Sequence, residues 1–243
     1  LGYGLVNAPA TEAVMGSLPV EKAGLGSGTQ ATTRQVGYAF GVAVPAGIIG
    51  TTGVGGLTLG GGLGHLTRGC GLTIDNLLEA DMVLADGRFV TVSAKKHADL
   101  FWAIRGGGGN FGVVTSFLFR THPVHTDYGG PMLYELGDAA EMMKWYRGFI
   151  KKAPNQLTGF FAFLTVPPGP PFPEHLHMKK MCGVVWCYSG PLKQAEKIFK
   201  PIRAFKKPAL DFVGPIPHPA LQGMFDPLFV PGLLWYWKAD FVK

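Results

Sequence analysis

The sequence lacks several features that mark common classes of protein. No long run of like charges occurs among its 22 basic and 16 acidic residues, so nucleic acid is not an expected partner despite the net charge of +6. Cysteine is rare: Cys70, Cys182 and Cys187 form an odd number without the spacing of a zinc site. A Cys182–Cys187 disulfide stays open, but a reducing compartment, and hence a cytoplasmic location, is the simpler interpretation.

Long apolar runs are missing too. A membrane-spanning helix needs about 20 apolar residues, whereas the stretch 36–50 is shorter and is broken by Pro45 and several glycines. Nothing in 51–243 offers such a span, so we expect no stable membrane insertion of that part. The start of the chain shows no basic leader followed by an apolar core and a small-residue cleavage site.

Glycine, in contrast, is abundant, at 36 of 243 residues. This share is about twice the average usage. Hydrophobic residues make up 47% of the chain, which excludes disorder because disordered chains lack residues to bury. The glycines do not recur at every third position, which excludes a collagen helix. We therefore expect a packed protein in which glycine lets the backbone come close to a ligand or to another part of the chain.

Many of these glycines lie in two clusters, 51–64 and 105–115. Ordering such backbone costs conformational entropy, and the usual compensation is a bound anion, such as a pyrophosphate, held by backbone N–H groups. The alternative is a pair of tight turns or a packing seam, and for one cluster alone the two explanations are about even. Two clusters so close in the sequence favour a ligand.

The second cluster also contains the literal pattern G-x-G-x-x-G, at 107–112. In dinucleotide-binding folds this pattern follows a strand and opens a helix. Here 101–104 resembles the end of a helix and 113–119 is rich in strand-forming residues, so the order is reversed. The chain has no Gly-Lys pair, which excludes a phosphate-binding P-loop.

The elements predicted along the chain are of mixed type. Asp86-Gly87 predicts the turn of a β-hairpin. From about 130 to 213 the order strand, helix, strand, strand, helix, strand predicts an antiparallel sheet with helices on one face, an α+β fold. A proline-rich loop at 167–173 separates the two middle strands of this series. Strands are predicted at 82–85, 89–92, 113–119, 160–166 and 181–188.

Two amphipathic helices are predicted in the same region. Asp138 with Glu141 indicates a capping box at the start of the first, and Pro191 is placed at the first helical position of the second. Lys193, Lys197 and Lys200 form a solvated face of the second helix. The residues expected to face the core are Met142, Trp145, Tyr146, Phe149 and Ile150, then Leu192, Ala195, Ile198, Phe199 and Ile202.

An ordered series of motifs then resembles a known family. The segments are 56–62 (GLTLGGG), 71–77 (GLTIDNL), 85–88 (ADGR), 99–105 (DLFWAIR) with the second glycine cluster, and 236–241 (YWKADF). Together they resemble the FAD-linked oxidases of the vanillyl-alcohol oxidase (PCMH-type) superfamily, in the berberine-bridge-enzyme-like branch. The resemblance runs from about Pro45 to the end. It implies part of an FAD-binding domain, its second lobe, over 45–125 and part of a substrate-binding domain over 126–243.

The resemblance implies a function and a cofactor site. In this family FAD accepts a hydride from an alcohol, sugar or similar small donor, and oxygen commonly reoxidises it. The first cluster would lie along the flavin ring and pyrophosphate, Asn76 would hold the adjoining turn with Asp75 as its partner, and 112–114 would bind the adenylate side. The implied FAD-binding residues are Thr52, Gly53, Gly56, Leu57, Thr58, Gly61, Gly62, Gly64, Asn76, Gly112, Val113 and Val114.

The sequence also departs from the family pattern. Members with a doubly attached flavin have a cysteine where this chain has Ile49, and Cys70 lies too far along, so no thioether link is expected. The segment that carries the usual flavin-linked histidine and the C-terminal part with the usual base are both missing from this sequence. No catalytic residue is assigned, and an inactive truncated or joined reading frame is the alternative.

Residues 1–44 resemble something else. The strings 7–16, 33–37 and 41–44 are similar to the end of one membrane helix, a loop and the start of the next in multidrug exporters of the major facilitator superfamily. This implies a helical, transporter-like segment without transport function. An ordinary pair of helices at a soluble N-terminus is the alternative.

A few other residues could carry chemistry. His175 and His177 could face one side of a strand as metal ligands, but a solvated loop is favoured and no metal site is expected. His65 and His97 are interpreted as surface or packing residues. Four tryptophans could line a substrate cavity but are more simply explained as core: Trp145, Trp186, Trp235 and Trp237.

Overall fold

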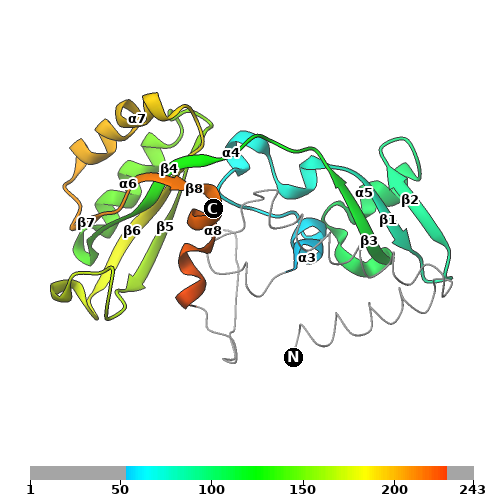
Figure 1. Ribbon diagram of the computed structural model, residues 1–243, viewed down its shortest axis with the longest axis horizontal. Helices are drawn as coiled ribbons and strands as arrows, with labels where there is room; N and C mark the ends of the chain where they lie inside the picture. Colours follow the sequence, from blue (N-terminus) through cyan, green and yellow to red (C-terminus); the bar gives the residue numbers. More distant parts are fainter. Residues whose placement is uncertain (1–52, 229–243) are drawn as a thin grey trace.

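The computed structural model describes residues 53–228 as two antiparallel sheets, each with its own helices (Figure 1). The exporter-like segment, Ile49, Thr52, Trp235 and Trp237 lie outside the described residues. No helix within 53–228 has the length and hydropathy needed to cross a membrane.

The first sheet has the strand order β2-β1-β3, and both pairings are antiparallel. The hairpin predicted at Asp86-Gly87 is confirmed, because Gly87 adopts φ +82° between β1 and β2 and the Arg88 N–H bonds the Asp86 carboxylate. The elements of this half are α3 (Val54–Leu59), α4 (Thr67–Cys70), η2 (Thr73–Asn76), β1 (Leu77–Val83), β2 (Phe89–Ser93), α5 (Ala98–Gly107), η3 (Gly108–Phe111) and β3 (Val113–Phe119).

The order of elements around the second glycine cluster is the one the sequence predicts. Helix α5 precedes the cluster and strand β3 follows it, so the dinucleotide-fold interpretation fails in the structure as well. Val92, Met82 and Ile104 are almost fully buried and join α5 to the sheet.

The second sheet has the order β5-β6-β4-β7, with β8 also paired to β4. All of its pairings are antiparallel, and the predicted alternation of strands and helices is confirmed. Its elements are β4 (Thr126–Glu135), η4 (Leu136–Asp138), α6 (Ala139–Phe149), β5 (Leu157–Thr165), η5 (Glu174–Leu176), β6 (Lys180–Tyr188), α7 (Leu192–Phe205), β7 (Leu210–Asp211), β8 (Gly214–Pro217), α8 (His218–Gln222) and η6 (Gly223–Leu228).

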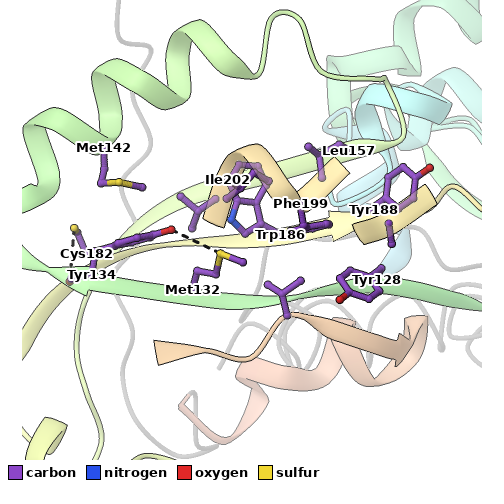
Figure 2. Close-up of a cluster of buried hydrophobic side chains, with 13 residues drawn as sticks. Tyr128, Met132, Tyr134, Met142, Leu157, Cys182, Trp186, Tyr188, Phe199 and Ile202 are labelled. Atoms are coloured by element: carbon purple, nitrogen blue, oxygen red, sulfur yellow. Dashed lines mark hydrogen bonds between the residues drawn. The ribbon is translucent and has the colours of Figure 1, made fainter. Parts of the chain in front are cut away.

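The core of the second half lies between this sheet and helices α6 and α7 (Figure 2). Trp186, at the centre of β6, is fully buried and meets Phe199 of α7 edge-on and Tyr146 of α6 at a tilt. Trp145 stacks on Phe149 and on a residue of α7, Phe205. Trp145 and Trp186 thus belong to the core, as the sequence favours, rather than to a substrate cavity.

Two details of the helices correct the sequence analysis. The capping box at Asp138 is wrong: the Asp138 carboxylate does not cap α6 but accepts a 2.6 Å hydrogen bond from Lys206 Nζ, which follows α7. Leu192 is 42% exposed rather than inward: it is the first residue of α7, whose buried residues begin at Ala195. Pro191 is the N-cap residue rather than the first helical residue.

The cysteines and the loop histidines also have clear positions. All three cysteines are free. Cys182 and Cys187 lie five residues apart on β6, so their side chains point to opposite faces and cannot form a disulfide. His177 bonds the Phe172 carbonyl within the proline-rich loop, and His175 is exposed, in line with the loop interpretation.

The two halves meet at helix α4. The guanidinium of Arg68 donates hydrogen bonds to the carbonyls of Ile150 (2.8 Å), Ala153 (3.2 Å) and Pro154 (3.3 Å), and also to that of Leu157. A small apolar cluster containing Leu66, Val185 and Leu221 adds packing between the halves. The glycine-rich half is therefore fixed against the second sheet.

Candidate functional site

The two glycine clusters lie against each other in the structure. Helix α3, which carries much of the first cluster, packs against α5 and η3, which carry the second. Arg105 joins the second cluster to η2, since its guanidinium donates to the Ile74 carbonyl (2.9 Å) and pairs with the Asp75 carboxylate (2.9 Å). The Ile74 N–H in turn donates to the Gly61 carbonyl of the first cluster. Arg105 had no role among the residues predicted to bind FAD, although it opens the second cluster. The two clusters therefore lie together on one side of this half.

Several glycines of this site present bare backbone. A Cβ added at Gly53 or Gly56 would meet nothing within 4 Å, and both residues are exposed. In the second cluster, an added Cβ would likewise meet nothing within 4 Å at Gly106, Gly108 or Gly109. Gly106 and Gly108 also have positive φ angles, of 103° and 65°. Internal packing does not require glycine at Gly53 and Gly56, and the missing side chains leave their backbone bare.

The loop between α3 and α4 offers free hydrogen-bond donors. The carbonyls of Gly61 and Gly62 accept from the N–H groups of Ile74 (3.0 Å) and Thr73 (2.9 Å), which fixes the loop with both glycines at positive φ. The N–H groups of Gly62 and Leu63 donate to no acceptor among residues 53–228. Adjacent unsatisfied N–H groups suit a phosphate or pyrophosphate, so this loop fits the anionic part of a dinucleotide such as FAD.

The remaining predicted residues of the first cluster face inward. Gly64 N–H bonds Thr67 Oγ1 at 2.7 Å and Gly61 N–H bonds the Thr58 carbonyl at 3.0 Å, so neither N–H is free for a ligand. Thr58 is fully buried and its Oγ1 has no partner among the described residues. Leu57 is half-buried, and its Cγ would lie 3.3 Å from a Cβ at position 62. These residues shape the loop from within.

Asn76 has the turn-holding role expected of it, but with different partners. Its amide donates to the carbonyls of Cys70 and Leu72, both at 2.9 Å, and its Oδ1 accepts from His122 Nε2 at 2.7 Å. The expected partner Asp75 instead accepts from the Leu72 N–H at 3.0 Å and pairs with Arg105. Asn76 is therefore a positioning residue whose amide is satisfied by its own chain.

The end of the second cluster adjoins an open strand edge. In the order β2-β1-β3, strand β3 pairs with β1 on one side, where Val113 faces Val83 and Val114 faces Met82. No described strand pairs with its other side. Because main-chain groups of alternate residues point to opposite edges of a strand, β3 presents main-chain donors and acceptors along that outer edge.

Gly112, just before β3, serves internal packing. It adopts φ +146°, and a Cβ there would lie 2.5 Å from the Val83 carbonyl oxygen. Glycine is thus needed at this position for β1 and β3 to approach each other, whatever the ligand.

The Cys70 thiol is unsuited to nucleophilic attachment of a cofactor. Burial raises the pKa of this thiol above its usual value, which disfavours the thiolate that would form a thioether. What Cys70 does contribute is its main-chain carbonyl, which accepts a hydrogen bond from the Asn76 side chain.

Comparison with known proteins gives a consistent result. A family model described as an FAD binding domain matches residues 22–93. An FAD-linked oxidoreductase of Dictyostelium discoideum is 34% identical over 206 residues, which are 84% of this chain and 42% of the relative. The chain thus spans less than half the length of that relative.

Solved structures share the fold. The wild-type BBE-like 1 protein of Physcomitrella patens matches with a TM-score of 0.57 and 28% identity, over 73% of this chain and 37% of that protein. A chitooligosaccharide oxidase matches with a TM-score of 0.61 and 26% identity, over 83% of this chain and 40% of the oxidase.

The family match also bears on the N-terminal part. It begins at residue 22, so residues 22–44 fall within the FAD-binding match, and none of these comparisons supports the exporter resemblance. The cofactor expected from the sequence, FAD, is the one that the matching family binds. Residues 22–93 thus match an FAD-binding domain, and the chain is similar to FAD-linked oxidoreductases, with a berberine-bridge-enzyme-like protein among its structural neighbours.

Proposed function

We propose that this chain holds FAD against its two glycine clusters and acts in an oxidoreductase that removes a hydride from an alcohol, sugar or similar small molecule. The observation that carries the proposal is the packing of α3 against α5 and η3, with unoccupied space beside Gly53 and Gly56. FAD, when bound, accepts the hydride and passes the electrons to an acceptor, for which we propose oxygen.

The protein's part in this activity is orientation. The free N–H groups of Gly62 and Leu63 would bind the pyrophosphate, and the outer edge of β3 at Val113 and Val114 would bind the adenylate side through main-chain groups. The bare backbone at Gly56 would lie along the flat ring system. Arg105 and Asn76 would act indirectly, by holding the turn and the two clusters in register.

For the donor we propose a saccharide. One of the structural relatives is by its name a chitooligosaccharide oxidase, and it matches over 83% of this chain. A sugar hydroxyl or hemiacetal carries the hydride and proton that an alcohol oxidation removes. Simple alcohols belong to the same reaction class and serve as comparison substrates.

We also propose a reducing compartment, the cytoplasm. Cys70, Cys182 and Cys187 are all free thiols, and two of them are fully buried. Strand geometry by itself keeps Cys182 and Cys187 apart, so the support for this proposal is the low cysteine count, three in 243 residues, without a disulfide framework of the kind typical of oxidising compartments.

An equilibrium titration tests the cofactor site. FAD fluorescence is followed while the chain, its Gly56→Val variant and its Gly148→Val variant are added. Both glycines lie in helices where an added Cβ meets nothing within 4 Å, so both substitutions cost the fold similarly. We expect saturable binding that weakens at least tenfold only in Gly56→Val. Absence of saturable binding, or equal weakening by both variants, would refute the assignment and favour an inactive fragment.

The donor class is tested on the loaded protein. Saccharides such as chitobiose and simple primary alcohols are added without oxygen, and loss of the oxidised flavin absorbance is recorded. Bleaching by saccharides alone supports the proposed donor, whereas bleaching by alcohols alone assigns a different substrate class.

A further inference from the structure

A buried cluster of metal-binding side chains lies away from the glycine site, on the second sheet. Asp127 on β4, Cys187 on β6 and His218 at the start of α8 each bring one ligand atom within 4.8 Å of the other two. Asp127 and Cys187 are fully buried and His218 is 1% exposed. No sequence motif links these residues, because they are 60 and 31 positions apart along the chain.

Strand register explains how they meet. Gly129 of β4 faces Cys187 of β6, and Asp127 lies two residues before Gly129, so its side chain projects from the same face as that of Cys187. Strand β8 pairs with the same end of β4, and the His218 N–H extends this ladder to the His125 carbonyl at 3.0 Å. Three neighbouring backbone segments therefore fix the three ligands, which gives the site a rigid frame.

The carboxylate at the centre of this cluster is incompletely satisfied. Asp127 Oδ2 lies 2.5 Å from His218 Nδ1, whereas the buried Oδ1 has no N–H or O–H donor among the described residues; the carboxylate's other neighbour is the Cys187 thiol, a weak donor. A buried carboxylate oxygen with at most a weak thiol donor is costly, and a cation is the partner that removes this cost most completely. The neighbouring thiol does not act as a nucleophile, since burial and the Asp127 charge strongly raise the pKa of Cys187.

A second unsatisfied group lies nearby. His65, which precedes α4, is 3% exposed, and its Nε2 has no partner among the described residues. Its ring interacts electrostatically with both His218 and Asp127, which places this second unpartnered group beside the cluster.

We propose that Asp127, Cys187 and His218 bind a zinc ion, with His65 as the candidate for the fourth position. Sulfur, nitrogen and oxygen ligands in one small site suit Zn²⁺, whereas Mg²⁺ and Ca²⁺ prefer oxygen alone. Zn²⁺ binding displaces the Cys187 proton to solvent, and the thiolate and carboxylate then balance the two positive charges. The Gln222 amide nitrogen lies 2.9 Å from His218 Nε2. When His218 binds the ion through Nδ1, the ring proton moves to Nε2 and the Gln222 amide turns its oxygen toward it, so that Nε2–H donates to Gln222 and orients the ring.

The role that follows is structural. The ion would join β4, β6 and α8 at the place where the second sheet meets the glycine-rich half, and the residues around it are too buried for substrate to reach. Because the ligands are closed off in the folded chain, the ion would enter during folding. The proposal does not depend on FAD binding, so its failure would leave the proposed function untouched.

Metal analysis of the whole chain tests this site. The protein is refolded with excess Zn²⁺ or Co²⁺, freed of unbound ion, and analysed for metal content and for the thiolate-to-cobalt charge-transfer band. We expect about one ion per chain and a clear sulfur-to-cobalt band. Less than about a tenth of an ion per chain after this treatment would overturn the proposal.

A matched pair of variants assigns the sulfur. Cys182 and Cys187 lie on the same strand and are equally buried, but on opposite faces. Cys187→Ser should abolish the charge-transfer band while Cys182→Ser keeps it. If Cys187→Ser does not fold, Asp127→Asn and the unaltered chain with a chelator supply the readout: loss of metal and a lower Tm. Retention of the band in Cys187→Ser, or its loss in Cys182→Ser alone, would contradict the assignment.

Discussion

Glycine has two different physical roles within one site of this protein. At Gly56 an added Cβ would enter open space, so packing within the described residues does not require glycine there. At Gly112 the Cβ would lie 2.5 Å from the Val83 carbonyl oxygen, with φ at +146°, so the fold itself requires glycine. The sequence analysis assigned both positions to FAD alike, because a run of glycines does not reveal which backbone approaches a ligand and which approaches another strand.

This distinction gives a stability prediction. Gly112→Ala should lower the free energy of unfolding by about 2–3 kcal/mol, since the methyl group must displace backbone and the φ angle disfavours any side chain. Gly109→Ala is the control, with nothing within 4 Å of its added methyl group, and should change stability by less than about 0.5 kcal/mol. Urea denaturation of both variants measures the difference, and equal stabilities would show that β1 and β3 can separate freely.

At the scale of elements, the sequence correctly predicted those helices, strands and turns that depend on residues close together in the chain. The Asp86-Gly87 turn, the helical stripe through Met142 and the helix–glycine–strand order around 106–112 are all present, because each depends on residues close in sequence. The capping box failed because Lys206, 68 positions away, takes the Asp138 carboxylate. The cluster of Asp127, Cys187 and His218 was missed for the same reason. Strand register alone brings these residues together, and no short sequence motif predicts strand register.

Two substitutions in helix α7 test which of its residues face the core. Phe199→Ala should lower the free energy of unfolding by about 3–5 kcal/mol, because the ring is fully buried between Trp186 and Tyr128. Leu192→Ala, on the same helix but 42% exposed, should cost less than about 1 kcal/mol. Thermal or urea unfolding followed by circular dichroism distinguishes them, and a comparable loss in both variants would mean that Leu192 packs inward after all.

At the scale of the whole molecule, the two sheets must keep a fixed geometry for the proposed function. A donor held by the second sheet can transfer a hydride to FAD on the glycine clusters only if the halves stay in register. Arg68 in α4 binds four carbonyls between Ile150 and Leu157, while α4 itself directly follows the loop with the free N–H groups. This side chain therefore connects the proposed cofactor site to the second sheet.

Arg68→Lys tests that connection, because lysine keeps the charge but lacks the planar fork that reaches several carbonyls. We expect a loss of about 2–3 kcal/mol in the free energy of unfolding and faster hydrogen exchange at the junction of α4 with 150–157. Arg88→Lys, which alters an exposed pair with Asp86, should change neither quantity measurably. If Arg68→Lys leaves exchange at the junction unchanged, the apolar contacts of Leu66 with Val185 and Leu221 hold the halves together by themselves.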